Sequence, residues 1–400
     1  MDPIARIRRM EGCFDALRTG DPAAPAAQSA YAALCRYMDS GDWLRDYERD
    51  EKGELPADLK RGVLSQDALY DLLTDIAEKM RCTPMKKIPV IIDCDPGVDD
   101  SYAIAMAHAH PEFEIVALTA VEGNVPAALT RRNCLCLREV LGMTDTKVAF
   151  GAELPLQKEY TRVVSVTHGG GGVGGIDFAE PERAPEDVPA WDLIYAEAVK
   201  HAGELILFAV GPLTNIAIAL RKYPDLPKYI KRFVIMGGGT FGNVSATDSR
   251  AEFNIWIDPT AAKEVFEKME VWMVGLNATH AAALTEQNFA DMLAVTAGQP
   301  GRAADFLHKL SAFSLENSYG RGEDNNVIHD ALAVAAVIDP DTVTFEKRYV
   351  YVEDGAVKNE GETVIAPAGT PNANCHVAMA VDQPRFVRML IDTCRHYCKA

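Results

Sequence analysis

The chain lacks long hydrophobic segments and any excess of positive charge. No apolar run reaches the ~18 residues that a membrane-spanning helix requires, and charges interrupt the apolar stretches of the N-terminal segment, so no signal peptide is expected. Lys and Arg number 40 against 58 Asp and Glu, giving a formal net charge of −18. Nucleic acids and anionic membranes bind clustered Lys and Arg. We therefore expect neither as a partner, and a small molecule instead.

The chain also lacks a regular cysteine pattern. Its nine cysteines are an odd number without regular spacing, and most lie in apolar segments, as Cys134 and Cys136 do. This arrangement is typical of reduced cysteines in a protein core and not of a disulfide framework. We expect a soluble, cytoplasmic protein.

Length and composition favour a large domain and a smaller one. The chain has 400 residues, of which 48% are hydrophobic, ample for a large buried core. The first part contains only helical patterns, over 2–19, 25–39 and 65–80. Residues 41–56 are charged and rich in turn formers, which predicts a connection without a helix. We expect a small all-α domain at 1–84 and a second domain at 85–400.

The second domain alternates short apolar runs with helical patterns. The runs that predict buried strands are 86–93, 113–121, 147–151, 205–211, 232–239 and 271–276. Strands that alternate with helices predict an α/β fold, a mostly parallel sheet flanked by helices. Ligands of such sheets bind beyond the carboxyl ends of the strands. The residues that follow each run are therefore the candidates for chemistry.

Four aspartates follow the first of these strands within eight positions: Asp93, Asp95, Asp99 and Asp100. Carboxylates this close repel each other, and an unpaired buried carboxylate is costly. No Lys or Arg occurs between Lys87 and Arg131 to neutralise them. A hard divalent cation, Ca²⁺ or Mg²⁺, would do so through oxygen ligands, and the absence of nearby Cys–His pairs argues against zinc.

Helix capping is the simpler explanation for part of this cluster. Asp99 and Asp100 precede a helical pattern, and acidic residues are common in the first turn of a helix. Capping does not account for Asp93 and Asp95, which end an apolar strand. The Pro-Gly turn between the two pairs would bring them together.

Residues 86–400 resemble the inosine–uridine nucleoside hydrolase family, whose signature is this aspartate-rich turn. Further motifs of that family follow in order: VEGN ending at Asn124, GPLTN at 211–215, MGGG at 236–239, GN at 242–243, AEFNIWIDP at 251–259 and HD at 329–330. The N-terminal helices lie outside this resemblance. Residues 40–73 resemble instead a short bacterial helical family of unknown function.

The resemblance implies a metal site and a substrate site. Ca²⁺ would be held by the carboxylates of Asp95, Asp100 and Asp330 and by the main-chain carbonyl of Val210, with Asp93 orienting its neighbours. The residues implied to contact the ribose are Asp99, Asn124, the backbone of Met236, Asn243, Glu252 and Asn254.

The implied reaction is hydrolysis of the N-glycosidic bond of a ribonucleoside to free base and ribose. Asp95 would take the proton of a water that the cation activates. Carboxylates would stabilise the positive charge that develops on the ribose. His329 is the candidate acid for the leaving base, and the alternative is that it only orients its loop.

Two other functions fit parts of the sequence. Asp93 and Asp95 also resemble the paired aspartates of haloacid dehalogenase-like phosphatases, although Gly97 stands where that motif has Thr or Val. A non-catalytic ribose- or nucleoside-binding protein would be expected to have lost metal ligands, and the sequence retains them all.

The glycine-rich segment 168–175 formally contains GxGxxG, but no helical pattern follows it to receive a pyrophosphate. We expect a lid over the substrate instead, with His168 in contact with it. Relatives tend to carry base-closing tyrosines where this chain has Phe313 and Asn317, followed by Tyr319 and Arg321. The choice between purine and pyrimidine bases therefore stays open. We also expect a homodimer or a homotetramer.

Overall fold

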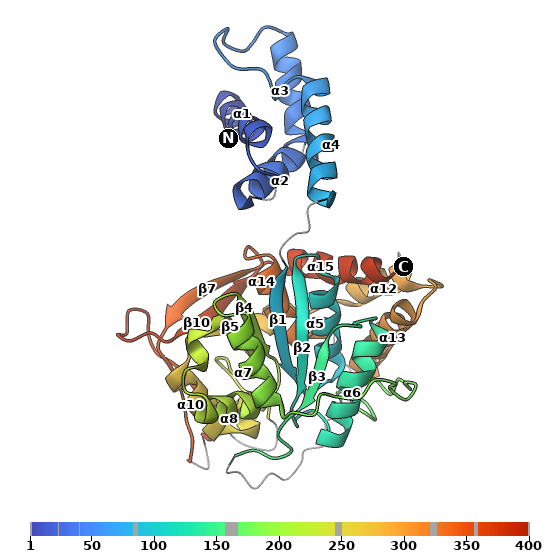
Figure 1. Cartoon of the computed structure of the whole chain (residues 1–400), viewed down its shortest axis with the longest axis vertical. Helices are drawn as coiled ribbons and strands as arrows, with labels where there is room; N and C mark the ends of the chain where they lie inside the picture. The colour runs from blue at the N-terminus through green and yellow to red at the C-terminus, as the bar shows by residue number, and fades with distance from the viewer. Residues whose placement is uncertain are drawn as a thin grey trace. The chain divides into compact units, whose positions relative to one another are not determined.

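The chain forms two compact units, Met1–Lys86 and Lys87–Ala400 (Figure 1). Each has a hydrophobic core of its own. The computed structural model describes residues 2–22, 24–39, 41–82, 87–156, 167–244, 250–320, 326–355 and 359–398. None of the helices in these ranges is long and apolar enough to cross a membrane.

The first unit is helical in its described residues. Its helices are α1 (Pro3–Thr19), α2 (Pro25–Asp39), α3 (Asp42–Glu51) and α4 (Gln66–Cys82). Helix α1 begins where the Asp2 side chain accepts a hydrogen bond from the backbone N–H of Ala5. The helices meet in a core that includes the fully buried Ile7, Leu34 and Leu69.

Helix α3 shows that the predicted connection without a helix at 41–56 is wrong. The segment is rich in charge, yet Trp43 is buried and Asp46 is completely buried on one face of the helix. Asp46 accepts hydrogen bonds from Nη2 of Arg6 at 2.6 Å and from the hydroxyl of Tyr37 at 2.8 Å. A charge that looks solvated in the sequence is therefore paired inside the unit, which a pattern of polar and apolar residues does not reveal.

The second unit is built on an eight-stranded sheet in the order β3-β2-β1-β4-β5-β6-β10-β7. Its strands are β1 (Ile88–Cys94), β2 (Phe113–Ala120), β3 (Lys147–Phe150), β4 (Leu205–Ala209), β5 (Ile230–Met236), β6 (Val271–Val274), β7 (Val343–Arg348) and β10 (Cys375–Val381). Neighbours pair in parallel except β10 and β7, which are antiparallel. Strands β8 (Val350–Val352) and β9 (Thr363–Ile365) form a small antiparallel pair. The predicted α/β fold with a mostly parallel sheet is confirmed.

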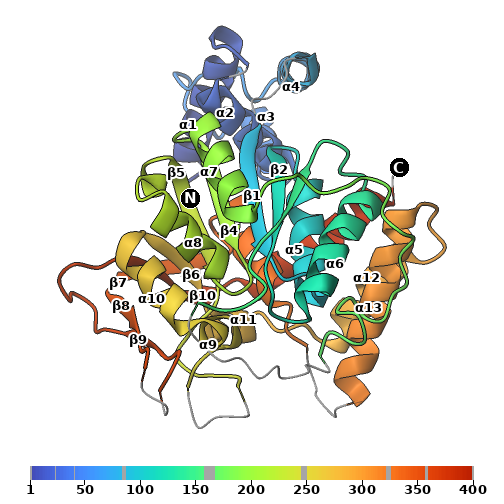
Figure 2. The same ribbon diagram turned by 60° about the horizontal axis from the view of Figure 1, so that its bottom comes forward.

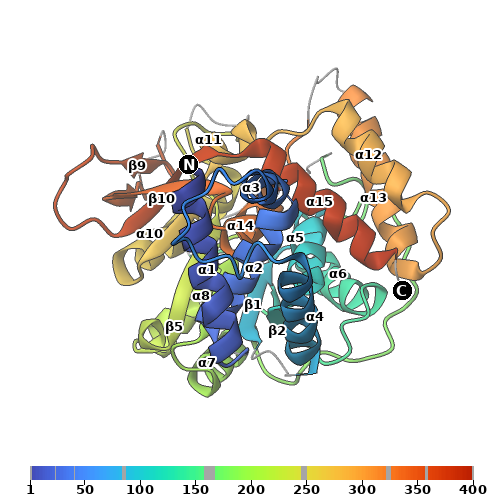
Figure 3. The ribbon, with the colours of Figure 1, turned by 90° about the horizontal axis from the view of Figure 1, so that it is seen from above.

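Helices cover both faces of this sheet, as Figures 2 and 3 show. On one side lie α5 (Val98–Ala109), α6 (Ala127–Val140), α12 (Glu286–Thr296), α13 (Arg302–Gly320), α14 (His329–Ile338) and α15 (Gln383–Tyr397). On the other lie α7 (Ala190–Lys200), α8 (Thr214–Lys222) and α10 (Pro259–Lys268). Strand β1 serves both cores, because Val90 and Ile92 face the first group and Ile91 the second.

Short elements complete the edge where the parallel strands end. Helix α9 (Phe253–Ile257) follows the loop after β5, and α11 (Leu276–Ala281) follows β6 directly. A 3₁₀ turn, Leu226–Lys228, lies at the opposite edge, before β5 begins. Figure 2 brings forward the edge that carries α9 and α11. The functional residues predicted from the sequence lie at this edge.

Candidate active site

The turn between β1 and α5 is organised by the carboxylate of Asp100. Its oxygens accept hydrogen bonds from the backbone N–H of Asp95 at 3.2 Å and from that of Gly97 at 2.8 Å. A side chain at Gly97 would collide with His168, because a Cβ there would lie 2.5 Å from its Nδ1. The turn therefore folds back onto a buried carboxylate, with glycine required at its tightest point.

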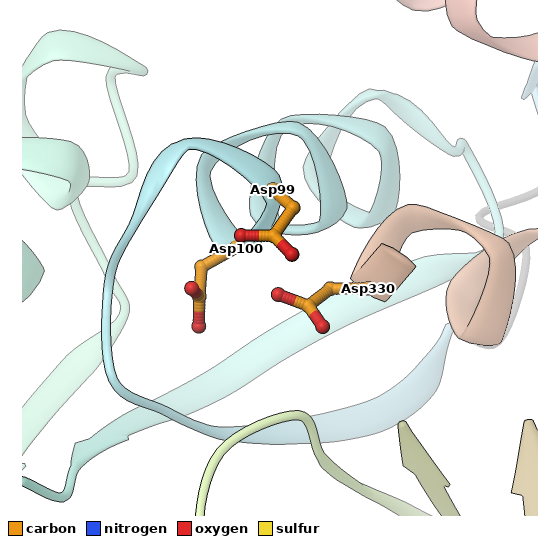
Figure 4. A group of neighbouring side chains, drawn as sticks. All are labelled: Asp99, Asp100 and Asp330. Carbon is orange, nitrogen blue, oxygen red and sulfur yellow. The ribbon is translucent and has the colours of Figure 1, made fainter. Parts of the chain in front are cut away.

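Three carboxylates converge beside this turn, from Asp99, Asp100 and Asp330. Each offers an oxygen within 4.8 Å of the others, and Figure 4 shows the side chains directed toward a common point. Asp99 and Asp100 lie in the first turn of α5, and Asp330 in the first turn of α14. Two helix N-termini thus supply the group, and the positive end of each helix dipole stabilises negative charge there.

Asp95 lies next to this group and has one oxygen engaged. Its Oδ2 accepts a 2.6 Å hydrogen bond from the backbone N–H of Asn124. Its Oδ1 is buried and accepts no hydrogen bond from any described residue, and Oδ1 of Asp99 is in the same state. Glycines make room for the carboxylate: a Cβ at Gly211 would lie 2.6 Å from Oδ1, and one at Gly123 would overlap Oδ2.

Without a bound cation, the carboxyl groups of this cluster ionise less readily than free carboxyl groups. Burial raises the pKa of Asp100 to about 7, and burial together with neighbouring carboxylates raises the pKa of Asp95 and of Asp330 well above the usual range. A cation would reverse this effect by stabilising the charged form. The oxygen-only donors fit a hard divalent cation, as do the buried carboxylate oxygens without a partner among the described residues, which are Oδ2 of Asp93 and Oδ1 of Asp95 and Asp99.

Asn254 connects two backbone carbonyls that the sequence places at the site. Its Nδ2 donates to the Val210 carbonyl at 3.0 Å and to the Met236 carbonyl at 3.2 Å. The N–H of Val210 in turn donates to the carbonyl of Asp93 at 2.8 Å, which continues the β1–β4 pairing. A carbonyl oxygen has two lone pairs, so Val210 keeps an acceptor position that a cation can use.

Backbone groups at the carboxyl edge of the sheet also orient Glu252, Asn243 and Asn124. Glu252 caps α9, with Oε1 accepting from the N–H of Asn254 at 2.9 Å and Oε2 from that of Gly238 at 3.0 Å. Asn243 Oδ1 accepts from the backbone N–H of Phe253 at 2.9 Å. Burial raises the pKa of Glu252 to about 7.

Asn124 closes the aspartate turn from the β2 side. Its Nδ2 lies 3.2 Å from both the Asp95 carbonyl and Oδ2 of Asp100, and donates to each. The structure thus gathers the residues predicted to bind the ribose. Their contacts with a substrate stay predictions.

His168 joins the glycine-rich loop to the start of α5. It is 8% exposed, and its Nδ1 accepts from the backbone N–H of Val98 at 3.2 Å and lies 3.6 Å from Oδ1 of Asp99. Asn133 of α6 holds the loop as well, since its Nδ2 donates to the carbonyls of Pro96 at 3.1 Å and Gly171 at 2.8 Å. The loop is therefore anchored on both sides of the aspartate turn.

Phe313 and Asn317 contact the same loop from α13. The ring of Phe313 lies against Gly169 and Gly174, and Asn317 Nδ2 donates to the carbonyl of Thr167 at 2.9 Å. Arg321 and the side chain of Tyr319, which the sequence places next, lie outside the described residues.

His329 begins α14 beside Asp330, and its Nδ1 lies 2.8 Å from Oγ1 of Thr279. The ring of His280 is 5.8 Å away, with Phe241 edge-on to it at 5.1 Å. Burial lowers the pKa of His329 to about 4. The imidazole is therefore neutral near pH 7, a state in which one ring nitrogen carries a proton and the other a lone pair.

The sequence reasoning missed several residues of this region. Thr279 and His280 follow β6, so the rule that ligands bind beyond strand ends would have found them. Asn215 and Thr119 hold Oδ1 of Asp93, at 2.8 Å and 2.6 Å. Asn215 lies within a motif that the sequence analysis quoted, whereas Thr119 and Asn133 carry no signal in a single sequence.

Sequence comparisons point to the same family as the motifs. The model of the family described as inosine-uridine preferring nucleoside hydrolase matches residues 90–388, and that of a domain of unknown function, DUF4298, matches residues 22–82. The non-specific ribonucleoside hydrolase RihC of Klebsiella pneumoniae is 40% identical over 309 residues, 76% of this chain and 96% of the relative. The pyrimidine-specific ribonucleoside hydrolase RihA of Escherichia coli is 34% identical over 320 residues, 78% of this chain and 99% of the relative.

Solved structures agree with these relationships. A purine-preferring ribonucleoside hydrolase from Gardnerella vaginalis superposes with a TM-score of 0.70 at 31% identity, over 78% of this chain and 99% of its own. A plant nucleoside hydrolase gives a TM-score of 0.69 at 29% identity, with the same coverage of 78% and 99%. The chain therefore belongs to the inosine-uridine preferring nucleoside hydrolase family.

Proposed function

We propose that this nucleoside hydrolase uses Ca²⁺ and the general base Asp95 to release free base and ribose from ribonucleosides. The observation that carries the proposal is the convergence of three carboxylates beside Asp95, whose Oδ1 is buried without a hydrogen-bond partner among the described residues. The named relatives act on ribonucleosides and differ in the base they prefer. We therefore propose ribonucleosides as the substrate class, without a choice between purine and pyrimidine bases.

The proposed cation ligands are the carboxylates of Asp95, Asp100 and Asp330 and the carbonyl of Val210. When bound, the ion supplies Lewis acidity toward water and neutralises the clustered charge. Mg²⁺ has the same preference for oxygen but demands a tighter octahedron, and the flexible coordination of Ca²⁺ suits a site built from separate strands and helices. Asp93 orients the end of β1 through its bonds to Thr119 and Asn215.

Asp95 performs the base step in this proposal. Its Oδ2 stays on the N–H of Asn124, which fixes the plane of the carboxylate, and Oδ1 takes the proton of the attacking water. Charge then develops on the ribose as the glycosidic bond breaks. The carboxylates of Asp99 and Glu252 stabilise this charge when ionised, and backbone N–H groups already orient that of Glu252 before the substrate reacts.

The ribose is proposed to be held by the edge of the sheet. The contacting groups are Asp99, Asn124, the backbone of Met236, Asn243, Glu252 and Asn254. His168 contacts the substrate from the loop 167–175. His329 lies next to Asp330 and donates a hydrogen bond to the leaving base through its second ring nitrogen.

A substrate panel tests the proposal. The purified protein is incubated with Ca²⁺ and a set of ribonucleosides, and released reducing sugar is measured. We expect ribose from at least one ribonucleoside, loss of activity with EGTA and recovery with added Ca²⁺. Asp330→Asn should be inactive. Asp392→Asn, which changes an exposed ion pair with Arg395 on α15, is the matched control and should be active.

Other outcomes identify the competing functions. No sugar release from any ribonucleoside, with nucleoside binding retained, would indicate a binding protein. Release of inorganic phosphate from sugar phosphates would indicate a phosphatase. Either result contradicts the proposed hydrolase.

A further inference from the structure

A hydroxyl group of α11 contacts the histidine beside the acidic group. Oγ1 of Thr279 lies 2.8 Å from Nδ1 of His329. Thr279 is 1% exposed, so bulk water does not compete for this contact. The hydroxyl has a longer contact with the carbonyl of Leu276, at 3.4 Å.

Counting protons leaves two arrangements of these groups. A hydroxyl has one proton to donate, and a neutral imidazole carries its proton on either Nδ1 or Nε2. If the hydroxyl donates to Leu276, then Nδ1 of His329 must be protonated and Nε2 has a lone pair. If the hydroxyl donates to His329, then Nδ1 is the acceptor and Nε2 carries the proton.

The two distances favour the second arrangement. It uses the hydroxyl proton in the 2.8 Å contact, whereas the 3.4 Å contact is beyond the usual range of an O–H donor.

We infer that Thr279 is a positioning residue that holds His329 in the tautomer with its proton on Nε2. The inference rests on the proposed hydrolysis, in which that N–H faces the departing base. The alternative role of Thr279 is a buried hydroxyl that only stabilises α11. The two roles predict different kinetics. Loss of a positioning residue slows the reaction most when the leaving group is poor, whereas loss of a purely stabilising hydroxyl affects good and poor leaving groups alike.

The bond changes define what the tautomer contributes. Water adds to the anomeric carbon and gives its proton to Asp95, while the bond to the base breaks with its electron pair on the base nitrogen. The N–H of His329 stabilises that developing charge by a hydrogen bond. A solvent proton completes the free base, and Asp95 returns its proton to solvent, so His329 gains and loses no net proton.

Two substitutions separate the hydroxyl from the shape of the side chain. Thr279→Val removes the hydroxyl and keeps the volume, and Thr279→Ser keeps the hydroxyl. Each is assayed on the best ribonucleoside and on p-nitrophenyl riboside, whose phenolate leaves without help from a donor. Because positioned proton donors contribute about 10²–10⁴-fold, we expect Thr279→Val to lower kcat on the nucleoside by about tenfold or more, with KM and aryl-riboside turnover little changed.

Thr279→Ser should restore nucleoside turnover close to that of the unsubstituted protein. Equal loss on both substrates, or no loss on either, would overturn the inference. If the unsubstituted protein cleaves no ribonucleoside, the proposed function has failed, and the kinetic comparison is replaced by the spectroscopic one.

Nitrogen NMR of the full chain reads the tautomer without turnover. With ¹⁵N-labelled histidine, the His329 signals are assigned by their loss in His329→Gln. We expect Nδ1 to be unprotonated and Nε2 protonated in the unsubstituted chain and in Thr279→Ser. Protonated Nδ1 in the unsubstituted chain would refute the assignment, and so would an unchanged pattern in Thr279→Val. If Thr279→Val does not fold, the spectrum of the unsubstituted chain decides alone.

Discussion

The backbone N–H of Asn124 donates a 2.6 Å hydrogen bond to Oδ2 of Asp95, and Oδ1 of the same carboxylate has no partner among the described residues. Asp95→Asn can keep the first contact through its carbonyl oxygen. It replaces the second oxygen by an amide nitrogen, which neither takes a proton nor binds a cation. We expect kcat to fall by several powers of ten, since general base catalysis alone contributes about 10²–10⁴-fold.

Asp93→Asn is the matched control for this variant. Asp93 is equally buried near the end of β1; its Oδ1 accepts bonds from Thr119 and Asn215, and its Oδ2, like Oδ1 of Asp95, has no partner among the described residues. Measurable turnover should remain, because the side chain orients the strand end without touching the substrate. An unaltered kcat in Asp95→Asn would contradict the role of Asp95 as base and ligand.

The stabilisation by Ca²⁺ should grow with pH. Without a cation the pKa of Asp100 and that of Glu252 are raised to about 7 by burial, from ordinary values of 3.8 and 4.5. At a pH between the ordinary and the raised pKa of each group, the folded protein holds a proton that the unfolded chain has released. The stability that these groups contribute is therefore present at low pH and is lost as pH rises through 7.

A cation that binds ionised Asp100 competes with the proton of that carboxyl group. Ca²⁺ should raise the melting temperature more at pH 8 than at pH 5, measured by thermal unfolding with Ca²⁺ and with EGTA. Asp330→Asn should remove most of the shift at pH 8. A shift of the same size at both pH values would show that the carboxylates are not the ligands.

The sheet and the location of the site could be predicted from the sequence because both depend on local patterns. Apolar runs predict the strands, and polar residues after them mark the ligand-binding edge. Contacts between distant residues could not be predicted. Asn215 and Asp93 are 122 positions apart, and Thr279 and His329 are 50 apart. Only the packed fold brings each pair together, and helix α3 was missed because its buried charge is paired in the same way.

The buried ion pair of the helical unit should be necessary for its stability. Asp46 is fully buried and bonded to Arg6 and Tyr37, and Asp46→Ala would remove both bonds and leave Arg6 its ion pair with Asp42 at 3.2 Å. Removing one partner of a fully buried pair costs about 3–5 kcal/mol, and the loss should be smaller here because Arg6 is partly exposed and keeps Asp42. Hydrogen exchange by mass spectrometry should show loss of protection across α1–α4 and unchanged exchange in β1.

Asp15→Ala is the comparison for that experiment. Asp15 pairs with Lys60 at 2.8 Å on the surface, where both side chains are exposed. Exposed pairs contribute little, so protection of α1–α4 should not change. Equal loss of protection in both variants would mean that burial of the Asp46 pair is not what stabilises the unit.

Residues 1–82 should be dispensable for catalysis. Every residue proposed to act on the substrate or the cation lies at or beyond Asp95, and the sheet of the second unit starts with Ile88. Each unit also has a separate hydrophobic core. A chain that begins at Thr83 should therefore fold, remain monodisperse in size-exclusion chromatography and cleave ribonucleosides with the kcat/KM of the full chain. Should the truncated chain aggregate or lose activity, the helical unit would be covering apolar surface that the enzyme cannot expose to water.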